Sequence, residues 1–145
     1  MSARFLLDTN ALTEPARAAP DRGFARQFEL HRQSLAIPSP ALHEALYGLF
    51  RMPPGRHRDQ VDDYLHNVLL PTVEVLPYDD EAARWHAAER ARLEAAGTPV
   101  SFADGQVAAV AARFDITLVT NNQRHFSRFQ GIRVLNWMSD ARSPA

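Results

Sequence analysis

Short apolar runs alternate with longer stretches of helical periodicity along this chain. The apolar runs that we interpret as buried strands cover 4–7, 35–37, 73–76, 116–119 and 133–135. The segments that we interpret as helices cover 21–33, 39–50, 56–70, 79–96 and 101–113, with a short helix or turn at 122–129. Alternating strands and helices predict an α/β fold, with a parallel sheet covered by helices on both faces.

Residues at the ends of these segments support the predicted boundaries. Ser39 and Pro40 have the residue types preferred at a helix N-cap and first turn, and Gly97 has the type preferred just after a helix. With 145 residues, the chain has the length of one domain. We expect that domain to cover 1–138, followed by a short frayed C-terminal tail at 139–145.

Composition excludes several kinds of chemistry. The chain has no Cys, and each of its 16 basic residues is an Arg. Without Cys there is no disulfide framework, thiolate zinc site or cysteine nucleophile. Without Lys there is neither a Walker A phosphate loop nor a Schiff-base amine. The N-terminus lacks the pattern of a signal peptide, and no apolar run is long enough to cross a membrane. A cytoplasmic location is expected.

The net charge of -1 conceals an uneven distribution of charge. Residues 1–58 carry a formal charge of +3, residues 59–104 carry -7, and residues 105–145 carry +3. Two basic ends could together meet an anionic polymer. The alternative is that the acidic middle is simply a solvated helical face.

Three acidic residues lie at predicted element ends that meet at one edge of the sheet. Asp8 directly follows the first strand, Glu44 lies early in the helix after the second strand, and Asp104 opens the helix 101–113. In open α/β sheets, ligands bind at the carboxyl ends of the strands. Each acid also has a structural explanation: Asp8 as a helix cap, Glu44 as an exposed helical residue, and Asp104 as part of a capping box with Ser101.

Two polar residues follow the fourth predicted strand at the same edge. Thr120 and Asn122 are ordinary turn formers, but they are also oxygen donors beside the three acids. Clustered carboxylates repel one another unless they are protonated or share a cation. A ligand set made only of oxygens suits Mg²⁺ or Mn²⁺ better than zinc. Such an ion activates water and stabilises the charge of a phosphoryl group.

Several segments of the chain, taken in their order along the sequence, resemble a PIN-domain ribonuclease. The resemblance is strongest to the VapC-type toxins of bacterial toxin–antitoxin pairs. The similar segments lie around Asp8–Glu14, Ser39–Gly48, Asp104, Leu118–Asn122 and Val134–Trp137. The resemblance implies a PIN-like three-layer fold, with a five-stranded parallel sheet in the order 3-2-1-4-5. It also implies Mg²⁺- or Mn²⁺-dependent cleavage of RNA, a small antitoxin partner and a homodimer.

By the same resemblance, Asp8, Glu44 and Asp104 take the acidic positions that hold the metal, and Thr120 and Asn122 complete the catalytic set. Many members carry a fourth acid where this chain has Asn122, and many carry an Asp near His125. The missing fourth acid at Asn122 leaves an alternative open, in which the protein is a PIN-like module that binds RNA or a partner protein without cutting RNA. A receiver domain or a dehalogenase-like phosphatase also uses an Asp after the first strand, but both need a Lys.

The remaining polar and aromatic residues have simpler interpretations. We expect His31, His57, His66 and His86 on solvent-exposed helix faces, His43 pointing away from Glu44, and Trp85 and Trp137 in the core. Apolar residues at 46, 49 and 50, or at 64 and 65, are candidates for a surface between protein chains. The sequence does not distinguish such a surface from core.

Overall fold

Five short parallel strands form the centre of the computed structural model, which describes residues 3–139. The strands are β1 (Phe5–Leu7), β2 (Leu35–Pro38), β3 (Glu74–Leu76), β4 (Thr117–Val119) and β5 (Val134–Leu135). Their order is β3-β2-β1-β4-β5, and each neighbouring pair is parallel. The predicted α/β fold and strand order are confirmed.

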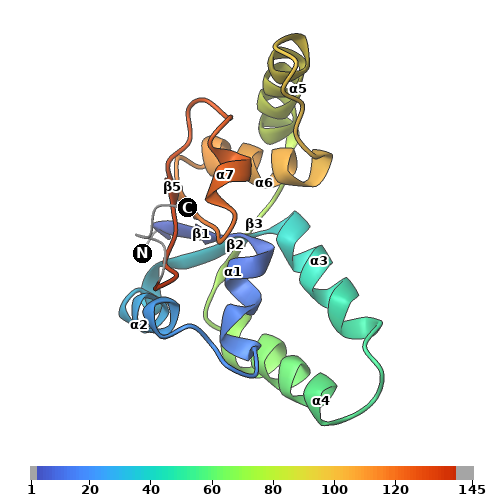
Figure 1. The fold of residues 1–145 in the computed structure, drawn as a ribbon, viewed down its shortest axis with the longest axis vertical. Helices are drawn as coiled ribbons and strands as arrows, with labels where there is room; N and C mark the ends of the chain where they lie inside the picture. Colours follow the sequence, from blue (N-terminus) through green and yellow to red (C-terminus); the bar gives the residue numbers. More distant parts are fainter. Residues whose placement is uncertain (1–2, 140–145) are drawn as a thin grey trace.

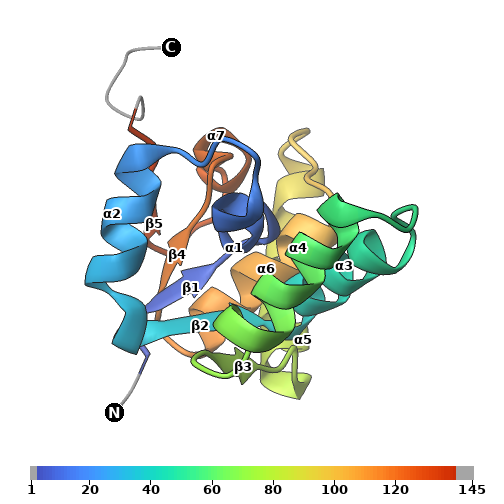
Figure 2. The same cartoon turned by 90° about the horizontal axis from the view of Figure 1, so that it is seen from below.

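Helices cover both faces of the sheet, as Figure 1 shows. One layer holds α1 (Thr9–Thr13), α2 (Arg22–Leu30), α3 (Ser39–Phe50) and α4 (Arg56–Asp63). The other holds α5 (Asp80–Ala95), α6 (Phe102–Arg113) and α7 (Gln123–Phe126). In Figure 2, which is seen from below, α4 of the first layer lies in front and α5 of the second layer lies behind. Two 3₁₀ turns, Glu14–Ala16 and Arg32–Ser34, and a π-helix, Tyr64–Leu69, complete the elements.

The alternation of side chains along β1 explains why there are two cores. Phe5 and Leu7 pack into the core beneath α1, α2 and α3, whereas Leu6 packs into the core beneath α5 and α6. All three side chains are buried. Because successive side chains of a strand point to opposite faces, a buried three-residue strand must be apolar throughout.

Several predicted boundaries need correction. The predicted helix 56–70 ends as α4 at Asp63 and continues as a π-helix, in which the N–H of Leu70 donates to the carbonyl of Leu65. In this segment the Tyr64 hydroxyl donates to the Leu12 carbonyl over 2.6 Å. Ser39 is not the N-cap of α3: Pro38 has that position, and the Ser39 hydroxyl accepts a hydrogen bond from the Tyr78 N–H.

The fold shows which of the candidate surface residues are buried in the core and which are exposed. Leu49, Tyr64 and Leu65 are buried in the core. Phe50 and Tyr47 remain exposed on α3, at 61% and 53%. At the C-terminal end, Ser139 hydrogen-bonds to Asp21, and the rest of the predicted tail lies outside the described residues.

Candidate active site

Asp8 occupies the carboxyl end of the central strand β1, where it is 6% exposed. It is also the N-cap of α1, so its predicted structural role is real and coexists with its place in the site. The carboxylate accepts two hydrogen bonds, from the Thr9 N–H at 2.7 Å and from the Thr120 hydroxyl at 2.9 Å. Burial raises the pKa of Asp8, and the negative charge of Asp104 raises it further.

Thr120 and Asn122 support Asp8 from the adjacent strand β4. Thr120 is fully buried, and its oxygen accepts a hydrogen bond from the Asn122 N–H over 3.0 Å. The Thr120 hydroxyl proton is therefore directed to Asp8. The side chain of Asn122 is exposed, and its described contact with this group is through its backbone.

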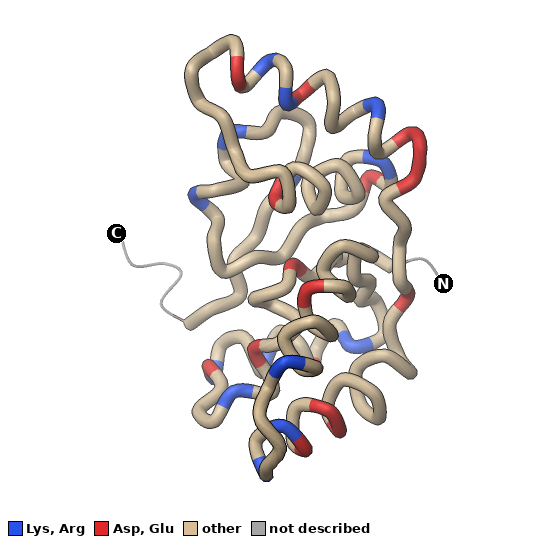
Figure 3. The backbone as a smooth tube through the Cα atoms, turned by 90° about the vertical axis from the view of Figure 1, so that its right-hand side faces the viewer, with Lys and Arg blue, Asp and Glu red and all other residues tan. Residues whose placement is uncertain are grey.

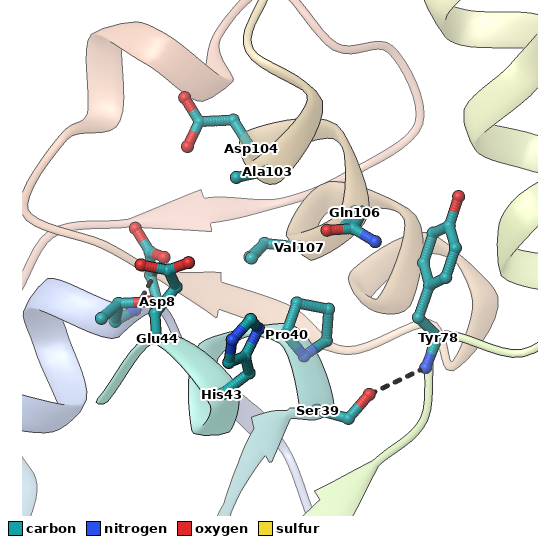
Figure 4. Close-up of a pocket in the computed structure, with 11 residues that line it drawn as sticks. Asp8, Ser39, Pro40, His43, Glu44, Tyr78, Ala103, Asp104, Gln106 and Val107 are labelled. Carbon is teal, nitrogen blue, oxygen red and sulfur yellow. Dashed lines mark hydrogen bonds between the residues drawn. The ribbon is translucent and has the colours of Figure 1, made fainter. Parts of the chain in front are cut away.

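The three predicted acids line one pocket of about 270 Å³. Asp8 enters it from the end of β1, Glu44 from the second turn of α3, and Asp104 from the first turn of α6 (Figure 4). Glu44 is exposed and Asp104 half-buried. Neither Thr120 nor Asn122 is among the lining residues.

Sequence reasoning missed part of this pocket. His43 lines it together with Glu44, although the sequence pattern assigned His43 no role in the site. Gln106 and Tyr78 line its other side, where Figure 4 shows them away from Asp8 and Glu44. Gln106 follows Ala103 by three positions on α6, a spacing that places both on one helical face. Tyr78 lies in the loop after β3 and carries no comparable sequence signal.

His86 is buried, which corrects the expected solvent exposure of this residue. Its Nδ1 lies 2.8 Å from the Tyr78 hydroxyl, and its ring packs against Phe102 and Gly105 at the start of α6. A Cβ on Gly105 would meet the His86 ring, so glycine permits this approach. Burial lowers the pKa of His86 and raises the pKa of Tyr78, which favours the neutral form of both groups. His31 likewise is half-buried, stacked on Trp137.

A second hollow, of about 300 Å³, adjoins the first at Asp104. The residues that line this hollow include Arg124 and His125 of α7 and Arg128, which lies just after the helix. The His125 Nδ1 lies 3.4 Å from Asp104 Oδ2, although the His125 side chain is 61% exposed. Elsewhere acidic and basic positions are interspersed on both halves of the molecule (Figure 3). Electrostatic attraction of an anion to this region therefore depends on Arg124 and Arg128.

The donor chemistry of the pocket fits a hard divalent cation. Its acidic side chains are three carboxylates from separate segments of the chain, and those of Asp8 and Asp104 are close enough to repel. In residues 3–139, no three His, Asp or Glu side chains are already gathered tightly enough to enclose an ion. Mg²⁺ tolerates such a site, because it is commonly held by one or two carboxylates and keeps several waters.

Comparison with known proteins assigns the family. Residues 5–132 match the sequence profile described as PIN domain. The chain belongs to the PIN-domain family. This PIN domain is 33% identical over 135 residues to the tRNA(fMet)-specific endonuclease VapC of Salmonella typhimurium, covering 92% of this chain and 98% of the relative. The predicted VapC-type resemblance is confirmed.

Solved structures agree with this assignment. The structure of DNA-bound VapBC from Salmonella typhimurium superposes on this PIN domain with a TM-score of 0.81 at 31% identity, covering 93% of this chain and 98% of the other. VapBC-5 from Mycobacterium tuberculosis, described as a member of the VapBC family of toxin–antitoxin systems, gives 0.69 at 26% identity, covering 94% and 98%. In the part of the chain that the structure describes, no helix is long and apolar enough to cross a membrane.

Proposed function

We propose that this PIN domain is a divalent-metal-dependent endoribonuclease, the toxin of a toxin–antitoxin pair. The observation that carries the proposal is the convergence of Asp8, Glu44 and Asp104 on one pocket at the carboxyl edge of the sheet. VapC relatives that match nearly the whole chain are named as endonucleases and ribonucleases. The reaction is hydrolysis of a phosphodiester bond in RNA.

Asp8 and Asp104 are the proposed principal ligands of the metal, and Glu44 the third, directly or through water. When bound, Mg²⁺ or Mn²⁺ supplies charge stabilisation at the phosphoryl group and lowers the pKa of water. Thr120 and Asn122 act through Asp8: their hydrogen-bonded chain fixes the orientation of its carboxylate. Outer-shell partners of this kind hold a ligand in position before the metal arrives.

Glu44 has a second proposed role as the proton acceptor. Its carboxylate is exposed on the pocket wall, so water from solvent can reach it. It orients the attacking water and takes its proton as the water oxygen bonds to phosphorus. The bond from phosphorus to the leaving ribose oxygen breaks, and that oxygen takes a proton from solvent. A positioned general base typically contributes about 10²–10⁴-fold to the rate.

Arginine supplies the contacts to the RNA backbone in this proposal. Arg124 and Arg128 line the hollow that adjoins the pocket at Asp104. A guanidinium holds a phosphate through paired N–H donors, and such contacts position a nucleic acid without reading its sequence. If the scissile phosphate of a single RNA strand lies near the three carboxylates, a neighbouring phosphate of the same RNA would lie toward α7.

The nuclease proposal is tested with purified protein, labelled RNA and a titration of Mg²⁺ or Mn²⁺ after treatment with chelator. We expect cleavage only with added metal, and loss of cleavage in Asp8→Asn, a variant that keeps the size of the side chain. Arg133→Gln is the control, because Arg133 is bonded to Asp115 away from the pocket. Full metal-dependent activity in Asp8→Asn would exclude the site assignment, and RNA binding without cleavage by the wild type would favour the binding module.

The proposed partners are a small cognate antitoxin protein and a second copy of this chain. Structural relatives described as VapBC and as a member of a toxin–antitoxin family support the antitoxin. Exposed Tyr47 and Phe50 on α3 offer apolar area for an interface between copies. We propose that this activity is cytoplasmic, because the proposed substrate, RNA, is present there.

Expression in a bacterial host tests the toxin assignment. We expect growth arrest when this chain is expressed alone, and rescue when the small reading frame beside its gene is co-expressed. Asp8→Asn is the matched control, because it removes the proposed activity while retaining the fold and the antitoxin surface. Equal arrest by Asp8→Asn would contradict a toxic effect through RNA cleavage.

A further inference from the structure

Tyr78 is held at both ends on the wall of the pocket away from Asp8. Its backbone N–H donates to the Ser39 hydroxyl at 3.2 Å, and its phenol oxygen lies 2.8 Å from Nδ1 of buried His86. His86 is in turn enclosed by Phe102 and Gly105. The ring of Tyr78 is thus fixed in orientation before any ligand binds.

The surface beside Tyr78 has hydrogen-bonding groups of both kinds. Gln106 lies next to it on the pocket wall (Figure 4), half-buried, and its amide can both donate and accept. The Ser39 hydroxyl uses its oxygen to accept from Tyr78 and keeps its proton for donation. His43 adds a second ring to the same pocket. None of these four residues is needed by the proposed hydrolysis.

A fixed aromatic ring with an amide beside it suits an unpaired nucleobase. Proteins that bind single-stranded RNA stack bases on aromatic side chains and read their edges with polar groups. A phosphate would instead need cationic donors, and this end of the pocket has no Arg among its lining residues. Because the acids lie across the same pocket, an occupant here would belong to a nucleotide next to the scissile phosphate.

We propose that Tyr78 and Gln106 form a nucleobase subsite, in which Tyr78 stacks on one base of single-stranded RNA and Gln106 hydrogen-bonds to its edge. This subsite rests on the proposed ribonuclease function and deepens it, because it assigns base preference to residues outside the acidic cluster. Tyr78 is the stacking platform, and His86 is its positioning residue.

Binding to a cleavage-deficient protein tests this subsite. In an Asp8→Asn background, the affinity for fluorescent tetranucleotide RNAs is measured with an abasic residue at each position in turn. We expect the abasic residue to weaken binding about tenfold at one position, the usual scale for loss of a stacked base. In Tyr78→Ala this penalty disappears, whereas in Tyr78→Phe, which keeps the ring, it remains.

Leu30→Ala is the control for loss of an exposed apolar side chain, because Leu30 is 71% exposed on α2 and lies outside the pocket lining. A purely structural role for Tyr78 would weaken all RNAs equally and leave the abasic penalty in place, which would overturn the subsite. Absence of measurable RNA binding would overturn it too. So would a Tyr78→Ala variant that loses binding to the antitoxin but keeps its binding to RNA. If Tyr78→Ala does not fold, Gln106→Ala serves instead, and an unchanged preference among the four bases rejects the proposal.

The test separates this subsite from the nuclease assignment. Failure of the nuclease proposal appears as absence of metal-dependent cleavage by the wild-type protein. Failure of the subsite appears in binding alone, as an abasic penalty that does not depend on Tyr78. An RNA-binding protein that does not cut would still show that dependence.

Discussion

The Thr120 hydroxyl donates a 2.9 Å hydrogen bond to Asp8, although the two residues are 112 positions apart in the chain. Parallel pairing of β1 with β4 sets this contact, because Leu7 lies in register with Val119. The residue after each strand then meets its counterpart at the same edge of the sheet. Each member of the pair explains the burial of the other.

Thr120→Val removes the hydroxyl while keeping the shape of the side chain. We expect weaker binding of Mg²⁺ and a roughly 10- to 100-fold loss of cleavage, the usual range for an outer-shell partner. Thr120→Ser, which restores a hydroxyl, should recover most of the activity. A metal titration of the cleavage rate measures both effects. Equal activity in all three proteins would show that Asp8 needs no such support.

The raised pKa of Asp8 predicts how stability depends on pH without metal. Folded protein keeps the Asp8 proton in a pH range where the unfolded chain has lost it. That contribution to stability is complete below the ordinary carboxyl pKa of 3.8 and is lost as pH rises through the folded pKa. Asp8→Asn should therefore have a higher Tm than wild type at neutral pH in chelator.

The same comparison at acid pH provides the control for this prediction. The difference in Tm should shrink as pH falls toward the ordinary pKa of Asp8, and added Mg²⁺ should stabilise the wild type alone. Thermal melts of both proteins across this range make the measurement. A difference in Tm that is independent of pH would point to a cause other than the charge of Asp8.

Gly105→Ala should destabilise the fold, because the added Cβ would overlap the His86 ring. We expect a loss of about 1–3 kcal/mol in the free energy of unfolding, as for other overpacked cores. Gly48→Ala on α3 is the matched control, since an added Cβ there would meet no atom within 4 Å outside its chain neighbours and the nearby backbone of its own helix. It should be neutral or gain up to about 1 kcal/mol from helix propensity. Denaturant unfolding compares them, and equal stability would disprove the tight contact.

Replacing Arg124 and Arg128 together by Gln should weaken RNA binding most at low salt. If each contacts one phosphate, the slope of log affinity against log salt should fall by about 1.4 in magnitude, since each contact to a single strand contributes about 0.7. Arg133→Gln should keep the wild-type slope, because Arg133 bonds to Thr117 and Asp115 at the N-terminal end of β4. Fluorescence anisotropy over a salt series measures the slopes, and an unchanged slope in the double variant would remove α7 from the RNA path.

Local patterns were enough to predict most elements of this PIN domain. Apolar runs bounded by Asp8, Pro38 and Thr120 marked three strands within one residue of their ends. Their alternation with helices predicted a parallel sheet, and its carboxyl edge pointed to the acids. The particular strand order came from the resemblance to PIN domains, because periodicity alone does not determine which strands are neighbours.

Burial of polar side chains was harder to predict than the elements. The sequence pattern of α5 does not predict the burial of His86, because that burial depends on Gly105 and Phe102 of another helix. The change to a π-helix at Tyr64 likewise accompanies a contact with the distant carbonyl of Leu12. Such contacts are made between elements, and a one-dimensional pattern contains no record of them.

The sequence by itself determined the fold class, the absence of Lys and Cys chemistry, and the candidates Asp8, Glu44 and Asp104. Only the tertiary structure decided that these acids share a pocket with Tyr78 and Gln106, and that the Thr120 hydroxyl donates a hydrogen bond to Asp8. The physical reason is that residue type and local period set which elements form. The pairing and packing of those elements determine which side chains meet.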